Sequence, residues 1–357
     1  MYKLIRPLIF KASSDPETMH RAMMTLLHMV GATPPLSWIE RQIFEFADDR
    51  LNQNIFNINF KNPVGLAGGF DKHAEALQGF ANLGFGFLEI GTVTKLSQPG
   101  NPRPRIFRLE KDKALINRMG FNNSGADALA KRSLSKKGNG VPIGINLGKS
   151  KLTQLNEATE DYLYSFKKLY NFGDYFVANI SSPNTPGLRQ LQDKQMLTDI
   201  VTALNDFKGK QQLKKPVFVK IVVDFTLEAI DEILQVCRDY KIDGIISSNT
   251  SVGREGLSKD PREAGGLSGK PIRQKSTDYI RHIHKQYPAL PIVGVGGIFS
   301  AGDAYEKIKA GASLVQIYTG LIYEGPGLVK KINQGLVKLL ERDGFKNISE
   351  AVGIEAR

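Results

Sequence analysis

The sequence predicts an α/β fold, namely a (β/α)8 TIM barrel preceded by a small N-terminal α-helical domain. Eight short runs that are apolar, β-branched or rich in glycine recur between residues 64 and 320, and helix-like segments usually follow them. Near-continuous apolar strands that alternate with helices are typical of a parallel sheet. Polar residues close the strands all along the chain, whereas a doubly wound sheet, the alternative, gathers them at one switch point. The predicted domains are 1–50 and 51–357.

The predicted barrel strands follow in chain order. They are 64–69, 85–93, 141–148, 174–181, 216–223, 242–250, 291–297 and 313–320. In a barrel of this type the catalytic residues lie at the C-terminal ends of the strands. Every one of these ends carries either a polar side chain or glycines, and glycines let a ligand approach the backbone.

Two amphipathic helices are predicted before the barrel, over 17–30 and 37–46, because their apolar residues recur at helical spacing. The residues alone leave open whether these helices cap one end of the barrel or carry a function. No apolar run approaches the roughly 20 residues that span a bilayer. The opening "MYKLIRPLIF" is broken by charges and a proline, so no secretory signal is predicted.

Composition and charge limit the kinds of ligand that the protein is expected to bind. The chain is 41% hydrophobic and 24% charged, which is ordinary for a globular protein. The net charge is +12, yet Lys and Arg are scattered and no nucleic-acid-binding motif occurs, so we expect anionic ligands and no nucleic acid. The single cysteine, Cys237, rules out an internal disulfide and is predicted to lie in the core.

Glycine-rich loops predict a phosphate site. The loops 294–298 and 318–320 follow strands seven and eight, where this fold usually binds phosphate, and 265–271 adds a third loop. Glycines there let backbone N–H groups point at an anion, although tight turns need glycine too. The dinucleotide fingerprint is absent after the first strand, so a mononucleotide such as FMN fits better than NAD.

Two lysines lie at strand positions where an unpaired buried charge would be costly. Lys220 lies inside the apolar run "VFVKIVV", and a buried ammonium needs a partner. It would either offset negative charge on a reduced flavin ring or form a salt bridge at the barrel mouth. Lys72 closes strand one and could meet a substrate carboxylate, with Asp71 beside it as a structural partner.

Asparagines recur at the strand ends and in the loops beside them. An asparagine supplies a donor and an acceptor together, so several in one cavity suit a neutral ring with amide and imide groups. A single one would more often be a turn residue or a cap. The set is Asn117, Asn122, Asn146, Asn179, Asn184 and Asn249.

Ser182 is the predicted proton-transfer residue. It lies in "NISSPNTPGLR", an unusually polar and proline-rich strand exit, with the Thr185 hydroxyl nearby in the sequence. No histidine presents a catalytic or metal-ligand spacing, so neither a Ser-His-Asp triad nor a metal site is predicted. The alternative for Ser182 is a cap or turn residue.

Long motifs now identify a resemblance that covers nearly the whole chain. They are "NPVGLAGGFDK", "EIGTVT…QPGNPRPR", "NRMGFNN", "NISSPNTPGLR", "IDGIISSNT", "GGLSGKP" and "GVGGI…AGASLVQIYTG". The chain resembles the dihydroorotate dehydrogenase family, specifically its class 2, which is quinone-linked and membrane-associated. The resemblance implies oxidation of (S)-dihydroorotate to orotate through FMN, in de novo pyrimidine (UMP) biosynthesis.

The resemblance also implies roles for individual residues. Ser182 would be the catalytic base, where class 1 enzymes carry a cysteine. The flavin site would comprise Gly68, Gly69, Phe70, Asp71, Lys72, Thr92, Asn146, Asn179, Lys220, Ser248, Gly269, Gly297, Tyr318 and Thr319. The pyrimidine site would comprise Lys72, Asn117, Arg118, Met119, Gly120, Phe121, Asn179, Asn184, Asn249 and Thr250. Family members often have Thr in place of Ser248, and the hydroxyl is retained.

Residues 1–50 would form an apolar tunnel that admits a membrane quinone, either ubiquinone or menaquinone. Their charges balance, with six basic and six acidic residues, so membrane anchoring would depend on apolar side chains. An arginine-rich transit peptide is absent, which favours a bacterial enzyme that is peripheral on the cytoplasmic face of the inner membrane. The oligomeric state is not determined by the sequence, and a monomer is compatible with it.

Three alternatives stay open at this stage. One is a class 1-like acceptor, fumarate or NAD, in place of quinone. The second is a phosphate-binding barrel enzyme without flavin, and the third is a basic binding protein without catalytic activity.

Overall fold

The computed structural model describes residues 2–12, 15–132, 140–181, 184 and 194–356. Eight parallel strands close into a barrel in the order β10-β12-β13-β3-β4-β7-β8-β9, which confirms the predicted fold class. The barrel strands are β3 (Val64–Asp71), β4 (Phe87–Val93), β7 (Ile143–Leu147), β8 (Tyr175–Asn179), β9 (Val217–Ile221), β10 (Gly244–Ser247), β12 (Ile292–Val295) and β13 (Leu314–Ile317). Each lies inside or overlaps one of the eight predicted runs.

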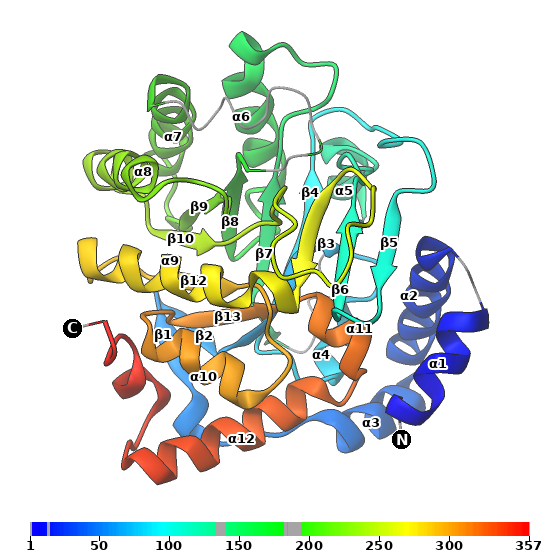
Figure 1. Ribbon diagram of the computed structural model, residues 1–357. Coiled ribbons are helices and arrows are strands. Elements are labelled where there is room, and N and C mark those ends of the chain that lie inside the picture. The colour runs from blue at the N-terminus through cyan, green and yellow to red at the C-terminus, as the bar shows by residue number, and fades with distance from the viewer. Residues whose placement is uncertain (1, 13–14, 133–139, 182–183, 185–193, 357) are drawn as a thin grey trace.

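Helices surround the barrel and bury their apolar faces against it (Figure 1). They are α4 (Leu77–Asn82), α5 (Ala126–Lys131), α6 (Ala158–Leu169), α7 (Lys194–Gly209), α8 (Leu227–Asp239), α9 (Arg273–Gln286), α10 (Ala301–Lys309), α11 (Thr319–Glu324) and α12 (Leu328–Asp343). Helix α8 illustrates why these segments form helices. The Thr226 side chain caps its first turn by accepting from Ala229 N, and Ile230, Ile233 and Cys237 point into the core. Cys237 is fully buried, as predicted.

Two small antiparallel sheets lie at opposite ends of the barrel. The hairpin of β1 (Gln53–Ile55) and β2 (Ile58–Phe60) closes the N-terminal end, where Phe60 packs on Phe87. At the C-terminal end β5 (Ile106–Leu109), β6 (Ala114–Asn117) and β11 (Gly266–Gly269) form a three-stranded sheet. This sheet was not predicted, and it joins the loop after β4 to the loop after β10.

Three helices precede the barrel: α1 (Tyr2–Ala12), α2 (Pro16–Ala32) and α3 (Pro34–Phe44). The two predicted helices correspond to α2 and α3, whereas α1 was not predicted. Helix α2 begins where Asp15 accepts from Glu17 N at 3.0 Å, and it packs closely on α4 because Gly79 has no side chain facing Leu27 O. The helices lie together on one side of the barrel, beside β5 and α11 (Figure 1).

Candidate active site

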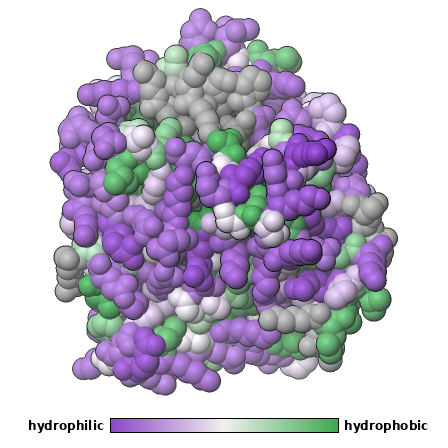
Figure 2. Space-filling view, viewed as in Figure 1, coloured by the Kyte–Doolittle hydropathy of each residue, from purple (hydrophilic) through white to green (hydrophobic). Residues whose placement is uncertain are grey.

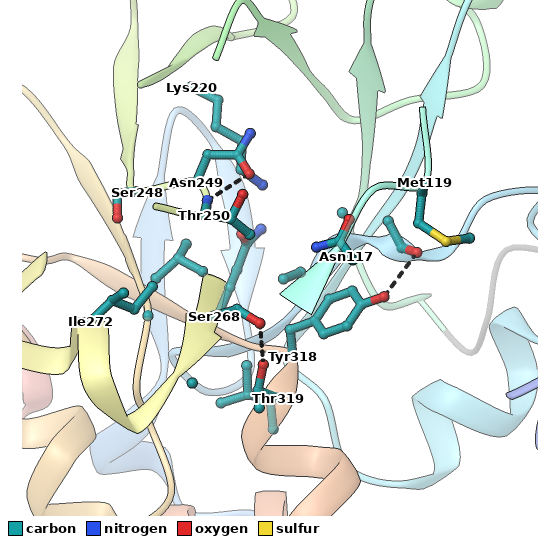
Figure 3. A pocket seen from close by; sticks show the side chains of 18 of the residues that line it. Asn117, Met119, Lys220, Ser248, Asn249, Thr250, Ser268, Ile272, Tyr318 and Thr319 are labelled. Atoms are coloured by element: carbon teal, nitrogen blue, oxygen red, sulfur yellow. Dashed lines mark hydrogen bonds between the residues drawn. The ribbon is translucent and has the colours of Figure 1, made fainter. Parts of the chain in front are cut away.

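A polar cavity opens at the C-terminal ends of the barrel strands (Figure 3). Most residues predicted for the flavin and pyrimidine sites line it, although they come from segments as far apart as Gly68 and Thr319. From the flavin set these are Gly68, Gly69, Lys72, Thr92, Asn179, Lys220, Ser248, Gly269, Gly297, Tyr318 and Thr319. From the pyrimidine set they are Lys72, Asn117, Met119, Gly120, Phe121, Asn179, Asn184, Asn249 and Thr250.

Four residues of the predicted flavin and pyrimidine sets lie outside the lining of this cavity. Phe70 faces a second, apolar cavity, and Asn146 lies directly behind the wall. Arg118 extends away to Glu263, with Nη1 2.8 Å from Oε2. The buried Asp71 carboxylate accepts from the backbone N–H groups of residues 73, 75 and 76, so it shapes the turn after β3. Ser182 and Thr185 lie outside the described residues.

The asparagines form a connected network at the strand ends. Asn146 Oδ1 accepts from Thr92 Oγ1 at 2.6 Å and from Asn179 Nδ2 at 3.0 Å. Asn249 Nδ2 in turn donates to Asn179 Oδ1 at 3.3 Å and to Ser181 Oγ at 3.0 Å. Each amide is therefore held in one orientation by its neighbour. The predicted Asn122 lies instead in an outer crevice.

A buried carboxylate that sequence reasoning missed lies at the centre of this network. Glu89 of β4 is 0% exposed, and its Oε1 accepts from Asn146 Nδ2 at 2.7 Å. Its Oε2 accepts from Gln316 Nε2 at 2.6 Å. Lys220 Nζ lies 3.3 Å from Glu89 Oε1 while its side chain also lines the cavity. The predicted salt bridge of Lys220 is therefore confirmed, and the side chain also contributes to the cavity wall, whereas its role toward a flavin ring stays a prediction.

Three glycine-bearing loops meet at one side of the cavity, as predicted for a phosphate site. Gly296 and Gly269 have φ values of +116° and +105°, which strongly favour glycine. A Cβ on Gly320 would lie 2.0 Å from Ile298 O, so glycine is also required by this close approach. The buried Ser248 Oγ has no hydrogen-bond partner among the described residues. An orphaned hydroxyl and an open glycine cradle fit a phosphorylated cofactor.

Further lining residues were not predicted individually, although residues 268, 295, 296, 298 and 320 belong to the three predicted glycine-rich loops. Most adjoin a predicted strand end, so their position along the chain was the available signal. They are Ala67, Ser268, Ile272, Val295, Gly296, Ile298, Gln316, Ile317 and Gly320. Ser268 reaches the cavity only because β11 joins the unpredicted sheet, where its Oγ lies 2.8 Å from Thr319 Oγ1.

A second cavity, of about 150 Å³, lies between the N-terminal helices and the barrel. It is mostly apolar, with Met19 and Met23 from α2 and Leu321 from α11 among its lining residues. Tyr318 lines both cavities, so the apolar space and the polar one adjoin at this side chain. Burial raises the pKa of Tyr318 to about 12 and lowers that of His20, in the apolar cavity, to about 4. Both groups are therefore neutral at physiological pH.

Across the described parts of the chain, no cluster of three or more His, Cys, Asp or Glu side chains has an arrangement that could hold a metal ion. The Glu89 carboxylate is instead occupied by amide and ammonium donors.

Comparison with known proteins places the chain in a family. The family model for dihydroorotate dehydrogenase matches residues 50–340. Dihydroorotate dehydrogenase (quinone) from Gloeobacter violaceus is 51% identical, with 99% of this chain and 98% of that protein covered. The protein of the same name from Christiangramia forsetii is 49% identical, covering 96% and 99%. A crystal structure of the Eimeria tenella enzyme in complex with ferulenol has a TM-score of 0.90 at 36% identity, and 99% of each chain is covered. The chain therefore belongs to the dihydroorotate dehydrogenase family.

Proposed function

We propose that this protein is a quinone-dependent dihydroorotate dehydrogenase, which oxidises (S)-dihydroorotate to orotate in pyrimidine biosynthesis. The observation that carries the proposal is the pair of cavities that meet at Tyr318. One is lined by amides, hydroxyls and lysines that suit a pyrimidine carboxylate and a flavin, and the other is apolar and suits a quinone. A class 1-like acceptor is not favoured, because relatives about 50% identical to this chain are named as quinone-dependent enzymes.

An anaerobic absorbance spectrum tests this proposal directly. The purified protein is expected to show a flavin absorbance band that bleaches when dihydroorotate is added. The band should return when a quinone is added. A band that does not bleach would refute the substrate. A colourless protein that FMN cannot reconstitute would favour a flavin-free phosphate-binding barrel.

FMN is the proposed cofactor, and the cavity residues fit it. Gly296, Gly297 and Gly269 would receive the phosphate end, where Ser248 Oγ supplies the otherwise unused hydroxyl. Lys220, held by Glu89, would lie near the ring and offset negative charge there. When bound, FMN would accept a hydride from the substrate and pass electrons to the quinone.

The proposed substrate site contains Lys72 beside Asn117, Asn179, Asn184 and Asn249. Ser182 is the proposed base for the proton at C5, with Thr185 relaying that proton outward. Asn184 Nδ2 donates to Asn117 Oδ1 at 3.4 Å, so these two side chains are in contact within the cavity wall. Such preset amides would orient the ring before the proton is removed.

Orotate binding is expected to weaken above about pH 8. Burial, followed by the nearby Arg105 guanidinium, lowers the pKa of Lys72 from its ordinary 10.5 to about 8, although the Glu17 carboxylate opposes the shift. The Lys72 ammonium is therefore present below that pH and is lost above it. Orotate affinity would be constant below pH 8 and would fall by up to about tenfold per unit above it, which is the limit for one linked proton. Titration of the flavin spectrum with orotate measures this, and a Lys72→Met variant should show weaker, pH-independent binding.

The apolar cavity is the proposed quinone route. Met19→Trp should overpack it and raise the quinone KM roughly tenfold, equivalent to about 1.4 kcal/mol. Flavin reduction by dihydroorotate should not change, because no side chain of the polar cavity is altered. Met29→Trp is the matched control, since Met29 lies on the same helix but is 59% exposed. A similar KM increase in both variants would contradict this route.

Residues 1–50 are the proposed membrane-facing domain, and 51–357 the catalytic domain. No helix within the described residues is long and apolar enough to cross a membrane. The side chains of Leu4, Leu8 and Trp38 are 81%, 69% and 64% exposed, and hydrophobic residues gather where α1–α3 lie, at the lower right of Figure 2. These apolar side chains would rest on the cytoplasmic face of a bacterial inner membrane as a peripheral contact.

Trp38 is the only tryptophan in the chain, so its fluorescence reports this contact. Lipid vesicles should shift its emission to shorter wavelength. The binding should be insensitive to salt because the charges of residues 1–50 balance. Trp38→Glu should reduce vesicle co-sedimentation, whereas salt-sensitive binding would point to the basic barrel surface instead.

A further inference from the structure

Helix α2 is joined to the barrel by a buried ion pair that has no role in the reaction as proposed above. Glu17, in the first turn of α2, is only 3% exposed. Its carboxylate accepts two hydrogen bonds from the buried Arg105, from Nε to Oε2 at 2.9 Å and from Nη2 to Oε1 at 2.8 Å. Arg103 adds a third, from Nη2 to Oε1 at 2.8 Å. A bidentate contact of this kind fixes both the position and the plane of the Arg105 guanidinium.

The remaining nitrogen of Arg105 holds the backbone of a tight loop. Its Nη1 donates to Pro99 O and to Asn101 O, both at 2.8 Å. Gly100 between them has a φ of +79°, and a Cβ there would lie 2.3 Å from Met119 O. The loop 99–101 is therefore pressed directly against the segment 117–121, and Arg105 keeps it closed.

Asn101 carries this constraint into the substrate cavity. Its backbone N–H donates to Met119 O at 3.0 Å, and its Nδ2 donates to Arg118 O at 3.0 Å and to Asn184 O at 3.3 Å. Met119 and Asn184 line the polar cavity. One side chain thus connects the two separate segments that the pyrimidine is proposed to contact.

We infer that Glu17 and Arg105 are positioning residues for the pyrimidine substrate. The carboxylate on α2 orients Arg105, Arg105 closes the loop 99–101, and Asn101 sets the backbone of residues 118, 119 and 184. The inference rests on the proposed function and deepens it. The helical domain would serve the dihydroorotate half-reaction as well as the quinone half-reaction.

Glu17→Gln tests the inference in the FMN-loaded, detergent-solubilised protein. The change keeps the size of the side chain but leaves the buried Arg105 without its counter-charge. The Kd for orotate, read from the flavin absorbance, is expected to rise roughly tenfold to 10²-fold, the scale of a small misplacement of binding groups. FMN content should not change, because the proposed flavin residues are not altered. Glu17→Asp, which keeps the charge, should recover part of the affinity.

Glu45→Gln is the matched control. It removes a carboxylate from the same helical domain, where Glu45 pairs with Arg41 at 29% and 42% exposure, and it should leave orotate binding unchanged. An unchanged orotate Kd in Glu17→Gln, with a raised quinone KM, would overturn the inference, since the pair would then only fasten α2 to the barrel.

A second variant covers the case in which Glu17→Gln fails to fold or loses FMN. Arg103→Gln disturbs the fold less, because Arg103 is 41% exposed. The orotate Kd of this variant should still rise by a few-fold. An unchanged Kd would also overturn the inference. The unmodified protein is measured first. If it does not bind orotate, the proposed substrate is wrong, whereas normal binding there and in all variants refutes only the positioning role.

Discussion

Ser182→Ala is expected to slow flavin reduction by dihydroorotate by about 10²- to 10⁴-fold, the usual contribution of a general base. The proton at C5 would lose its acceptor, while the amides that hold the ring stay in place. Anaerobic stopped-flow absorbance at saturating dihydroorotate measures the rate. FMN content and the Kd for orotate should stay close to those of the unmodified protein.

The neighbouring Ser181 provides a contrasting variant. Ser181 is buried, and its Oγ donates to Asn179 Oδ1 at 3.2 Å and accepts from Asn249 Nδ2 at 3.0 Å. Ser181→Ala should therefore weaken orotate binding a few-fold, through about 1 kcal/mol of lost hydrogen bonding, and should change the reduction rate little. If Ser182→Ala alters only affinity, as expected for Ser181→Ala, then Ser182 orients the substrate and is not the base.

Lys220→Met is expected to destabilise the protein by about 3–5 kcal/mol, because it leaves the Glu89 carboxylate in the barrel without its cation. Glu89 and Lys220 have side-chain exposures of 0% and 6%, so water cannot replace the lost ammonium easily. The midpoint of guanidinium-induced unfolding measures the loss. Lys149→Met is the matched control, since Lys149 is also buried but its ammonium donates to two backbone carbonyls. It should cost about 1–3 kcal/mol.

Removing both charges should recover most of this stability. In Lys220→Met/Glu89→Gln the buried site is neutral, so the double variant is expected to be more stable than Lys220→Met alone. Flavin affinity should be lower than in the unmodified protein in both variants, because the cation proposed to face the ring is missing from each. A double variant that is no more stable than the single one would show that Lys220 stabilises the barrel by packing and not by charge.

Local sequence patterns were sufficient to predict the strands and the polar strand ends that line the cavity. Each barrel strand is a short apolar run between turn residues, and a closed parallel barrel sends every strand end to the same face. Once the eight runs were recognised, Lys72, Asn179, Lys220 and Asn249 were expected at one cavity, and all four line it. The phosphate-type loops followed from the same reasoning, because their glycines occur directly after the last two strands.

Other features depend on contacts between residues far apart in the chain, which local patterns do not encode. Glu89 stands inside the apolar run 85–93, and nothing beside it indicates that it faces the barrel interior toward Lys220, 131 residues away. Strands β6 and β11 pair across about 150 residues, and only that pairing brings Ser268 to Thr319. Glu17 and Arg105, which are 88 residues apart, meet because α2 packs beside β5. The sequence by itself determined the elements and their polar ends, since these follow from local propensity and burial. The tertiary structure alone decided which buried charges and amides pair, because that depends on how the closed barrel and the N-terminal helices are packed.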